Sequence, residues 1–395
     1  MGLTVKKPAK GRGEGKSSII VSLILFAVII GIAFFIYFKS RDIDLKKINA
    51  GNLIESIFSP EAYSTGKAEV EIPYDVKELY AFCTYKDMII KCSRDSVSGL
   101  NNKGEEVWTR SILVGSPMVK TNGSELLVAD KGGKDIYVLN GNGVKWDKKV
   151  DNNIINADIS KSGYVTIIHE ARGYKGMIKV FDPLGIEIFS KHIANKFVLK
   201  ADVSPSGKLM TISSLDISGS NIDPYLEFFD MLGESLACKS LKKGEVYVSV
   251  WYLKNDVTVA VSDSSLTCID REKGEEWEKD YTRIYSSGTI LGKYIVLAVD
   301  SYDSTGAAGG SREVVILNSE GKMVAACPIR DEVINIETFS DIIAVNAGRK
   351  IYFINAGGKI TGEYASKSDI EEVYFLNKQE ALAVTKGSIA VVKVN

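Results

Sequence analysis

The chain has 395 residues, about two to three times the size of an ordinary single domain, so it holds either several domains or one large repeat architecture. A composition of 45% hydrophobic and 25% charged residues, with 35 glycines and 8 prolines, excludes a collagen-like, mucin-like or wholly disordered protein. The net charge of −1 predicts no basic face for nucleic acid, and 2 histidines leave little room for histidine-based metal or acid–base chemistry.

The N-terminus combines a basic tail with a long apolar segment. Residues 1–17 carry five Lys or Arg side chains and one Glu, and residues 17–38 carry no charge. About 20 apolar residues are enough to cross the hydrocarbon core of a bilayer as a helix. A cleaved signal peptide is the alternative, but the segment is longer than such a peptide requires and lacks a small-residue cleavage site. We therefore expect a transmembrane helix over 18–38 that anchors the chain in the lipid bilayer, with the basic tail in the cytoplasm.

A polar stalk, residues 39–65, precedes a repeat that organises residues 66–395. In each unit an apolar strand ends in Asn or Asp, a tight turn with Gly follows, and a new strand begins. The glycines of these turns recur about every 42 residues, at positions 104, 143, 185, 233, 274, 321 and 358. Four short strands per unit at that period are typical of a propeller blade, so we predict an all-β fold, a β-propeller.

The two ends of the repeat region determine the expected number of blades. The C-terminal segment, 382–395, supplies two strands of a blade and then stops, which leaves this blade without its fourth strand. The strand at 67–73 precedes the first complete innermost strand and can supply the missing one. We therefore predict an eight-bladed β-propeller that closes by pairing of 67–73 with the C-terminal blade, with a seven-bladed ring as the alternative.

Two repeats resemble the blade motif of pyrroloquinoline-quinone-like β-propellers, in which a Trp after a Gly turn docks on the neighbouring blade. They are LNNKGEEVWTRSI (100–112) and IDREKGEEWEKDY (269–281). The tryptophans that follow a repeat glycine by three or four residues are Trp108, Trp146 and Trp277. The resemblance covers about residues 67–395 and implies a fold rather than an activity. With the apolar N-terminal segment included, the chain resembles an uncharacterised family of membrane-anchored propeller proteins from Gram-positive-type bacteria.

Motifs for catalysis are few. A quinoprotein-like or other enzyme that uses the central funnel is the enzymatic alternative, and the resemblance implies for it a calcium ion, carboxylate ligands and often adjacent cysteines. The five cysteines are separate, in apolar strand patterns that mostly predict burial, and there is no G-x-S-x-G nucleophile motif. His169 and His192 are expected at the surface or in a hairpin, because no motif supplies an orienting partner. We expect a protein that is not an enzyme and has no cofactor.

Three connections between the second and third strands of a blade are longer than the others: 170–176, 214–225 and 300–312. Equivalent connections of all blades project from one face of a propeller, so we expect the three to gather on one rim and to carry recognition. Drift in loop length without a function is the alternative. The candidate binding residues are Arg172, Tyr174, Asp216, Asn221, Asp223, Tyr225, Asp300, Tyr302 and Asp303. Loop 214–225 is also a candidate for calcium, although its oxygen-bearing side chains lack EF-hand spacing.

These features predict a single-pass protein of the cell membrane whose extracytoplasmic propeller is a non-enzymatic scaffold in the bacterial envelope. Its expected partner is an envelope protein or a glycan component of the cell wall, bound at the long loops. A ligand sensor is a further alternative, which the tail disfavours because its 17 residues hold no domain that could relay a signal.

Overall fold

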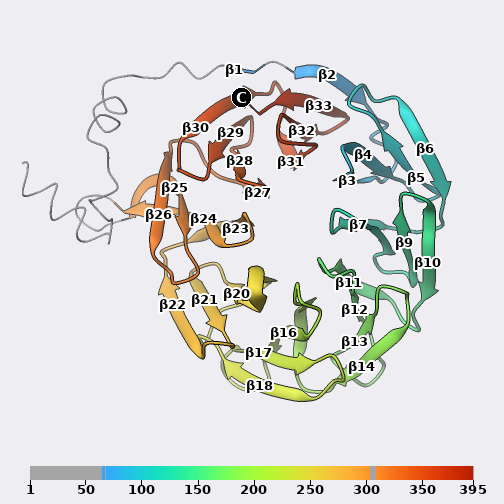
Figure 1. Cartoon of the computed structure of the whole chain (residues 1–395), viewed down its shortest axis with the longest axis vertical. Helices are drawn as coiled ribbons and strands as arrows, with labels where there is room; N and C mark the ends of the chain where they lie inside the picture. The colour runs from blue at the N-terminus through green and yellow to red at the C-terminus, as the bar shows by residue number, and fades with distance from the viewer. Residues whose placement is uncertain (1–64, 67, 303–307, 395) are drawn as a thin grey trace, which may run out of the picture. The chain divides into compact units, whose positions relative to one another are not determined.

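Strands make up most of the chain that the computed structural model describes, residues 65–66, 68–302 and 308–394. These strands form eight sheets, and each sheet is one blade of a closed β-propeller (Figure 1). The helix in this part of the chain is a 3-10 turn, η2 (Lys254–Asp256). The helix expected over 18–38 lies outside the described residues, and within them no helix is long and apolar enough to cross a membrane.

Each blade contains strands A, B, C and D, counted outwards from the centre of the ring (Figure 1). Blade 1 consists of β3 (Ala81–Tyr85), β4 (Met88–Cys92), β5 (Ser96–Leu100) and β6 (Glu106–Ser111). Blade 2 consists of β7 (Pro117–Thr121), β8 (Leu126–Asp130), β9 (Asp135–Asn140) and β10 (Gly143–Lys149). Blade 3 consists of β11 (Ile154–Ile159), β12 (Val165–His169), β13 (Gly176–Phe181) and β14 (Glu187–Ile193). Blade 4 consists of β15 (Phe197–Val203), β16 (Leu209–Asp216), β17 (Asp223–Asp230) and β18 (Ser235–Ser240).

Blade 5 consists of β19 (Ser249–Tyr252), β20 (Thr258–Val261), β21 (Ser265–Asp270) and β22 (Glu275–Asp280). Blade 6 consists of β23 (Ile284–Ile290), β24 (Tyr294–Tyr302), β25 (Ala308–Leu317) and β26 (Met323–Ile329). Blade 7 consists of β27 (Asn335–Phe339), β28 (Ile342–Asn346), β29 (Lys350–Asn355) and β30 (Ile360–Ala365). Blade 8 consists of β31 (Ile370–Phe375), β32 (Glu380–Thr385), β33 (Ser388–Lys393) and, from the other end of the described chain, β2 (Ala68–Pro73).

Blade 8 closes the ring. Its outermost strand, β2, pairs antiparallel with β33, from Ala68 opposite Val392 to Pro73 opposite Ser388. The prediction of eight blades is therefore confirmed, and the seven-bladed alternative is wrong. One further pairing was not expected: β1 (Thr65–Gly66) lies parallel to β30 and adds a fifth strand to blade 7. Two residues carry no periodic pattern, so the sequence had no signal for it.

The hydrophobic core lies between neighbouring blades. Strands B are buried along most of their length; β8 and β12, for example, have no exposed residue. Between blades 2 and 3, side chains of both blades form one apolar cluster, among them Ile136, Val138, Val165, Ile167 and Phe181. Strands covered on both faces in this way have apolar runs rather than simple alternation.

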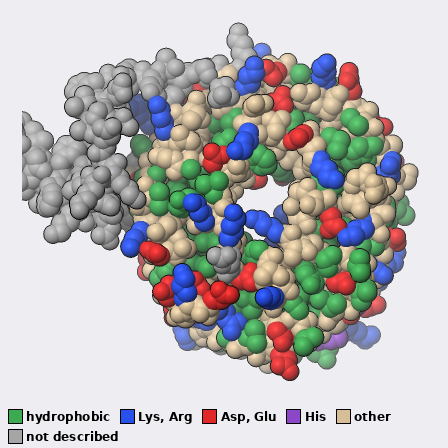
Figure 2. Space-filling model, viewed as in Figure 1, with side chains coloured by type: hydrophobic (Ala, Val, Ile, Leu, Met, Phe, Trp, Pro, Cys, Tyr) green, Lys and Arg blue, Asp and Glu red, His purple; other side chains and the backbone are tan. Residues whose placement is uncertain are grey.

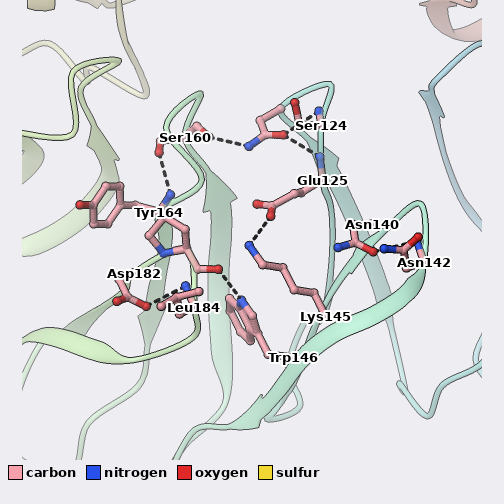
Figure 3. Close-up of polar contacts among 12 residues, drawn as sticks. Ser124, Glu125, Asn140, Asn142, Lys145, Trp146, Ser160, Tyr164, Asp182 and Leu184 are labelled. Atoms are coloured by element: carbon pink, nitrogen blue, oxygen red, sulfur yellow. Dashed lines mark hydrogen bonds and ion pairs between the residues drawn. The ribbon is translucent and has the colours of Figure 1, made fainter.

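A side chain of strand D docks on the C–D turn of the next blade, and Figure 3 shows this contact between blades 2 and 3. The indole of Trp146 on β10 donates from Nε1 to the carbonyl oxygen of Pro183, at 3.3 Å. It lies against Gly185, whose φ of 81° and missing side chain both suit the turn, because a Cβ there would be 2.8 Å from the indole. The glycine therefore serves the neighbouring blade as well as its own turn.

The same docking recurs at other interfaces, in the pairs Trp277–Gly321, Phe189–Gly233 and Ile72–Gly104. Docking on the neighbouring blade is thus confirmed for Trp146 and Trp277, and Phe and Ile take the equivalent place elsewhere. Trp108 also packs against the apolar cluster between blades 1 and 2, but not on the glycine of the next C–D turn. Its indole lies over Gly99, which is its direct cross-strand partner in blade 1, because that glycine leaves the space above the sheet open.

Candidate functional site

One mouth of the central channel is surrounded by the A–B hairpins of all eight blades. A cavity of about 890 Å³ opens there, and its lining includes residues from every one of these hairpins. Figure 2 shows the opening at the centre of the ring, with Lys and Arg side chains near its edge. B–C connections lie at the opposite end of each antiparallel blade, so the predicted binding loops project from the other face.

Hydrogen bonds join successive A–B hairpins around the mouth. They run from Tyr85 Oη to Ser124 O (2.8 Å), Asn122 Nδ2 to Ser160 O (3.0 Å), Ser162 Oγ to Ser204 O (3.0 Å), Lys254 N to Gly292 O (2.7 Å) and Leu291 N to Ser340 O (2.7 Å). Each of these bonds links one blade to the next. The mouth is therefore built as a connected rim rather than as independent loops.

The rim also concentrates backbone strain. Every described non-glycine residue with a positive φ lies in an A–B hairpin: Lys86, Asp87, Asp256, Leu291 and Ser340. Leu291 and Ser340 both have a φ of 54°, a conformation that costs an L-residue about 1–2 kcal/mol. Such strain persists only where the surroundings enforce it, and it is frequent at ligand-binding sites.

Charged side chains from the inner strands line the channel below the rim. Lys200 forms an ion pair with Asp158, which ties blade 4 to blade 3. Asp202 and Glu337 line the same cavity, and neither makes an ion pair with a side chain in the described part of the chain. Burial raises the pKa of Asp202 to about 6 and that of Glu337 to about 7, because nearby lysines compensate only in part.

On the opposite face, the long B–C connections of blades 3 and 4 are neighbours. Arg172 and Tyr174 lie in the turn that follows β12; both are exposed, and the Tyr174 ring contacts the His192 ring at 4.5 Å. From the same turn, Lys175 lies over the ring of Phe197 at the start of blade 4, at 4.7 Å. The first predicted loop therefore contacts blade 4 at its innermost strand, β15, and the second predicted loop belongs to that same blade.

Half of segment 214–225 is strand rather than loop. β16 and β17 have 8 residues each and pair as far as Asp216 opposite Asp223, which leaves 217–222, including the exposed Asn221, as the loop. Tyr225 lies within β17, where Lys196 sits over its ring at 4.0 Å. The carboxylate of Asp216 accepts from Ser218 N and Oγ, at 2.9 and 2.7 Å, and Lys243 Nζ lies 3.2 Å from Asp223.

The third predicted loop belongs to blade 6 and is separated from the other two by the short B–C hairpin of blade 5. β24 has 9 residues and β25 has 10, so segment 300–312 is largely an extended hairpin. Asp300 accepts a hydrogen bond from Tyr285 Oη at 2.8 Å and has Arg312 Nε at 3.7 Å. Tyr302 is the last residue of β24, and Asp303 lies outside the described residues.

Other residues singled out in the sequence lie as follows. In the described chain, no group of three or more His, Cys, Asp or Glu side chains is placed to hold a metal ion. All five cysteines are free thiols; four are buried, as expected, and Cys238 is exposed. His192 is at the surface as predicted, but a surface position is wrong for His169. It is fully buried at the end of β12, and its Nδ1 lies 2.7 Å from Glu170 O.

The channel residues Asp202 and Glu337 were missed from the sequence. A usable signal was present, because a charged residue interrupts the same part of several inner strands, as in ADIS, ADVS and NIET. In an innermost strand such a residue faces the channel rather than the next blade.

Similar solved structures share the fold. BamB from Moraxella catarrhalis matches with 16% identity and a TM-score of 0.56, over 83% of this chain and all of that one. The C-terminal WD40 domain of Sif2 matches with 9% identity and a TM-score of 0.58, over 84% of this chain and 99% of that one. Sqt1 from Chaetomium thermophilum, bound to the N-terminus of the ribosomal protein L10, matches with 10% identity and a TM-score of 0.57, over 83% of this chain and 100% of its own.

These neighbours include both a pyrroloquinoline-quinone-like and a WD40 type of propeller, and at such identities the likeness concerns the fold alone. No curated protein matches the chain. A family match covers residues 61–394, a range that contains every described strand of the propeller. The chain belongs to DUF5711, a family of unknown function.

Proposed function

We propose that this protein is a membrane-anchored, extracytoplasmic scaffold that binds an envelope protein through the B–C face of its propeller. The proposal rests on one observation, that the B–C hairpins of different blades project to different heights on that face. In blades 4 and 6 the B and C strands are 8 to 10 residues long, whereas those of blades 1, 2, 7 and 8 have 5 or 6. At about 3.3 Å per residue, the longer hairpins project roughly 10 Å further.

Exposed side chains on the B–C connections of blades 3 and 4 suit contact with a polar protein surface. In the turn of blade 3, Tyr174 is 47% exposed and Arg172 is also exposed. In the loop of blade 4, Ile217 is 51% exposed and Asn221 is also exposed. Tyr and Arg are enriched in protein interfaces because each combines a large contact area with a hydrogen-bonding end. The Sqt1 propeller, which shares this fold, is seen bound to the N-terminus of ribosomal protein L10. Anchoring is supported by the charge-free segment 17–38 and the basic tail before it.

Site-specific photo-crosslinking in intact cells tests this proposal. A benzophenone amino acid replaces Tyr174 on the B–C face in one variant of the full chain and Leu232 in another. Leu232 is 88% exposed but lies in a C–D turn on the opposite face, so it is a matched control. We expect a discrete protein adduct from position 174 and none from position 232, and shortening of 217–222 should reduce the adduct.

Three results would contradict the proposal. They are adducts that are equal at the two positions, an adduct only from position 232, or an adduct at 174 that a cell-wall hydrolase removes and a protease does not. The last result would identify a glycan in place of a protein.

A further inference from the structure

The channel mouth has the features of a ligand site that is independent of the B–C face. Its cavity of about 890 Å³ is large enough for a small molecule or the end of a peptide. Hydrogen bonds between hairpins and strained turns hold its rim in place. A preformed rim of this kind lowers the ordering cost of binding.

The carboxylates in this cavity are unevenly compensated. Asp158 lines it and is engaged by Lys200, and Glu372, which lies outside the lining, accepts a hydrogen bond from Tyr374 Oη at 2.7 Å. Asp202 and Glu337 line the cavity, are partly buried and have no ion-pair partner in the described part of the chain. Two partly buried carboxylates without such a partner favour a bound positive charge.

The charged groups around these two carboxylates compensate their negative charge only in part. Lys200 and Lys161 act on Asp202, but Lys200 is already paired with Asp158. Lys120 acts on Glu337, where the negative charge of Glu372 opposes it. The net effect is that the pKa of each carboxyl stays above its usual value, so a bound cation would stabilise the ionised forms.

We infer that the channel mouth binds an organic polycation through Asp202 and Glu337, with the indole of Trp251 as part of the binding surface. Asp202 is on blade 4 and Glu337 on blade 7, so two other blades separate them and a ligand with at least two cationic groups fits better than a single ammonium. Trp251 lines the same cavity from blade 5, between them in the ring, where an aromatic face attracts an alkylammonium.

A metal ion fits this site less well than an amine. Ca²⁺ and Mg²⁺ take six or more oxygen ligands in a compact shell, and the described chain has no group of three or more His, Cys, Asp or Glu side chains placed to hold a metal ion. An anion would meet Lys86, Lys161 and Lys254, but these lie on exposed turns of the rim, where water screens their charge. Of the lysines on the inner strands, Lys200 is engaged by Asp158 and Lys120 acts on Glu337. The inner wall therefore favours a flexible organic cation.

Two sources could supply this chemistry, a free polyamine and a Lys-rich segment of a polypeptide. Titration calorimetry on the detergent-solubilised full-length chain at pH 8 uses spermidine and a tri-lysine peptide as probes, with Mg²⁺ and inorganic phosphate as comparison ions. We expect binding of at least one of the two amines, and the tighter of them identifies the source. The double variant Asp202→Asn/Glu337→Gln should weaken this binding roughly ten-fold or more, because charge-assisted hydrogen bonds are lost.

Controls separate the site from general charge effects. Asp263→Asn removes an exposed carboxylate from the B–C face and should leave the affinity unchanged. The single variants and Trp251→Leu should each weaken binding by a smaller factor, which keeps the test decisive if the double variant does not fold. Absence of amine binding, full binding by folded Asp202→Asn and Glu337→Gln variants, or preference for Mg²⁺ or phosphate would overturn the inference. Because the two faces are distinct, these results leave the crosslinking test unaffected.

Discussion

At the residue scale, the repeat turns are stabilised by one hydrogen-bond acceptor each, the side chain of an Asn or Asp. Asp182 accepts hydrogen bonds from the backbone N–H groups of Leu184 (Figure 3) and Ile186, both at 2.8 Å. Asn318 and Asn355 make the same pair of bonds in blades 6 and 7. Asn and Asp recur here because their short side chains reach the backbone two and four residues ahead.

Gly185→Ala tests whether that turn is shaped by the neighbouring blade. The new Cβ would meet the Trp146 indole and would also occupy a left-handed conformation. Gly132→Ala is the matched control, because Gly132 has the same φ of 81° and nothing within 4 Å of a Cβ. We expect Gly185→Ala to lower the free energy of unfolding by about 1–3 kcal/mol more than the control in denaturant titrations of the solubilised chain. Equal losses would show that the contact with Trp146 is unimportant.

Glu337 predicts a particular pH dependence of stability. Its pKa is about 7 in the folded state against an ordinary value of 4.5, so between these values the folded protein keeps a proton that the unfolded chain has lost. Stability therefore falls as the pH rises from about 5 to 7, by at most about 1.4 kcal/mol per pH unit. Glu337→Gln has no such proton and should flatten the curve. A parallel curve for this variant in denaturant titrations at pH 5, 6, 7 and 8 would refute the assignment.

At the scale of elements, the turns predicted the architecture better than the strands did. Gly and Asx residues mark every complete blade, so the period and the ring could be inferred without any packing information. The long hairpins were misjudged in detail, because polar residues in 214–216 suggested a loop. Ser214 is in fact fully buried within β16, where it donates to Glu227 at 3.0 Å, beside Ser213, which donates to Tyr247 O at 2.7 Å. Such partners come from distant residues that the local sequence does not indicate.

Closure by β2 can be tested with two adjacent residues. Ile72 is buried, packs on the turn at Gly104 and belongs to the apolar cluster between blades 8 and 1, whereas Glu71 points to solvent. Ile72→Ala should lower the free energy of unfolding by about 2–4 kcal/mol, as expected for loss of a buried branched side chain. Glu71→Ala should change it by less than about 0.5 kcal/mol. If both variants melt at the same temperature in calorimetric scans, β2 does not secure the ring.

At the scale of the whole molecule, the ring creates sites from residues that are far apart in the sequence. Asp202 and Glu337 line one cavity although 135 positions separate them, and no periodicity predicts that their charges share a wall. The topology also separates the molecule into two faces, a connected rim at the channel mouth and an uneven B–C face with the long hairpins. The sequence could indicate the second face from loop length alone, but the first required the closed ring.

The proposed scaffold requires the propeller to lie on the extracytoplasmic side of the membrane, and labelling of Cys238 measures this directly. This residue is the one exposed cysteine of the five, all of which the structure describes, and partial burial raises its pKa, so labelling is best done at mildly alkaline pH. In intact cells, a membrane-impermeant maleimide should label the wild type and not Cys238→Ser, and the labelled chain should stay in the membrane fraction. Labelling only after the cells are lysed, or a labelled chain released into the soluble fraction, would contradict the anchored, extracytoplasmic scaffold.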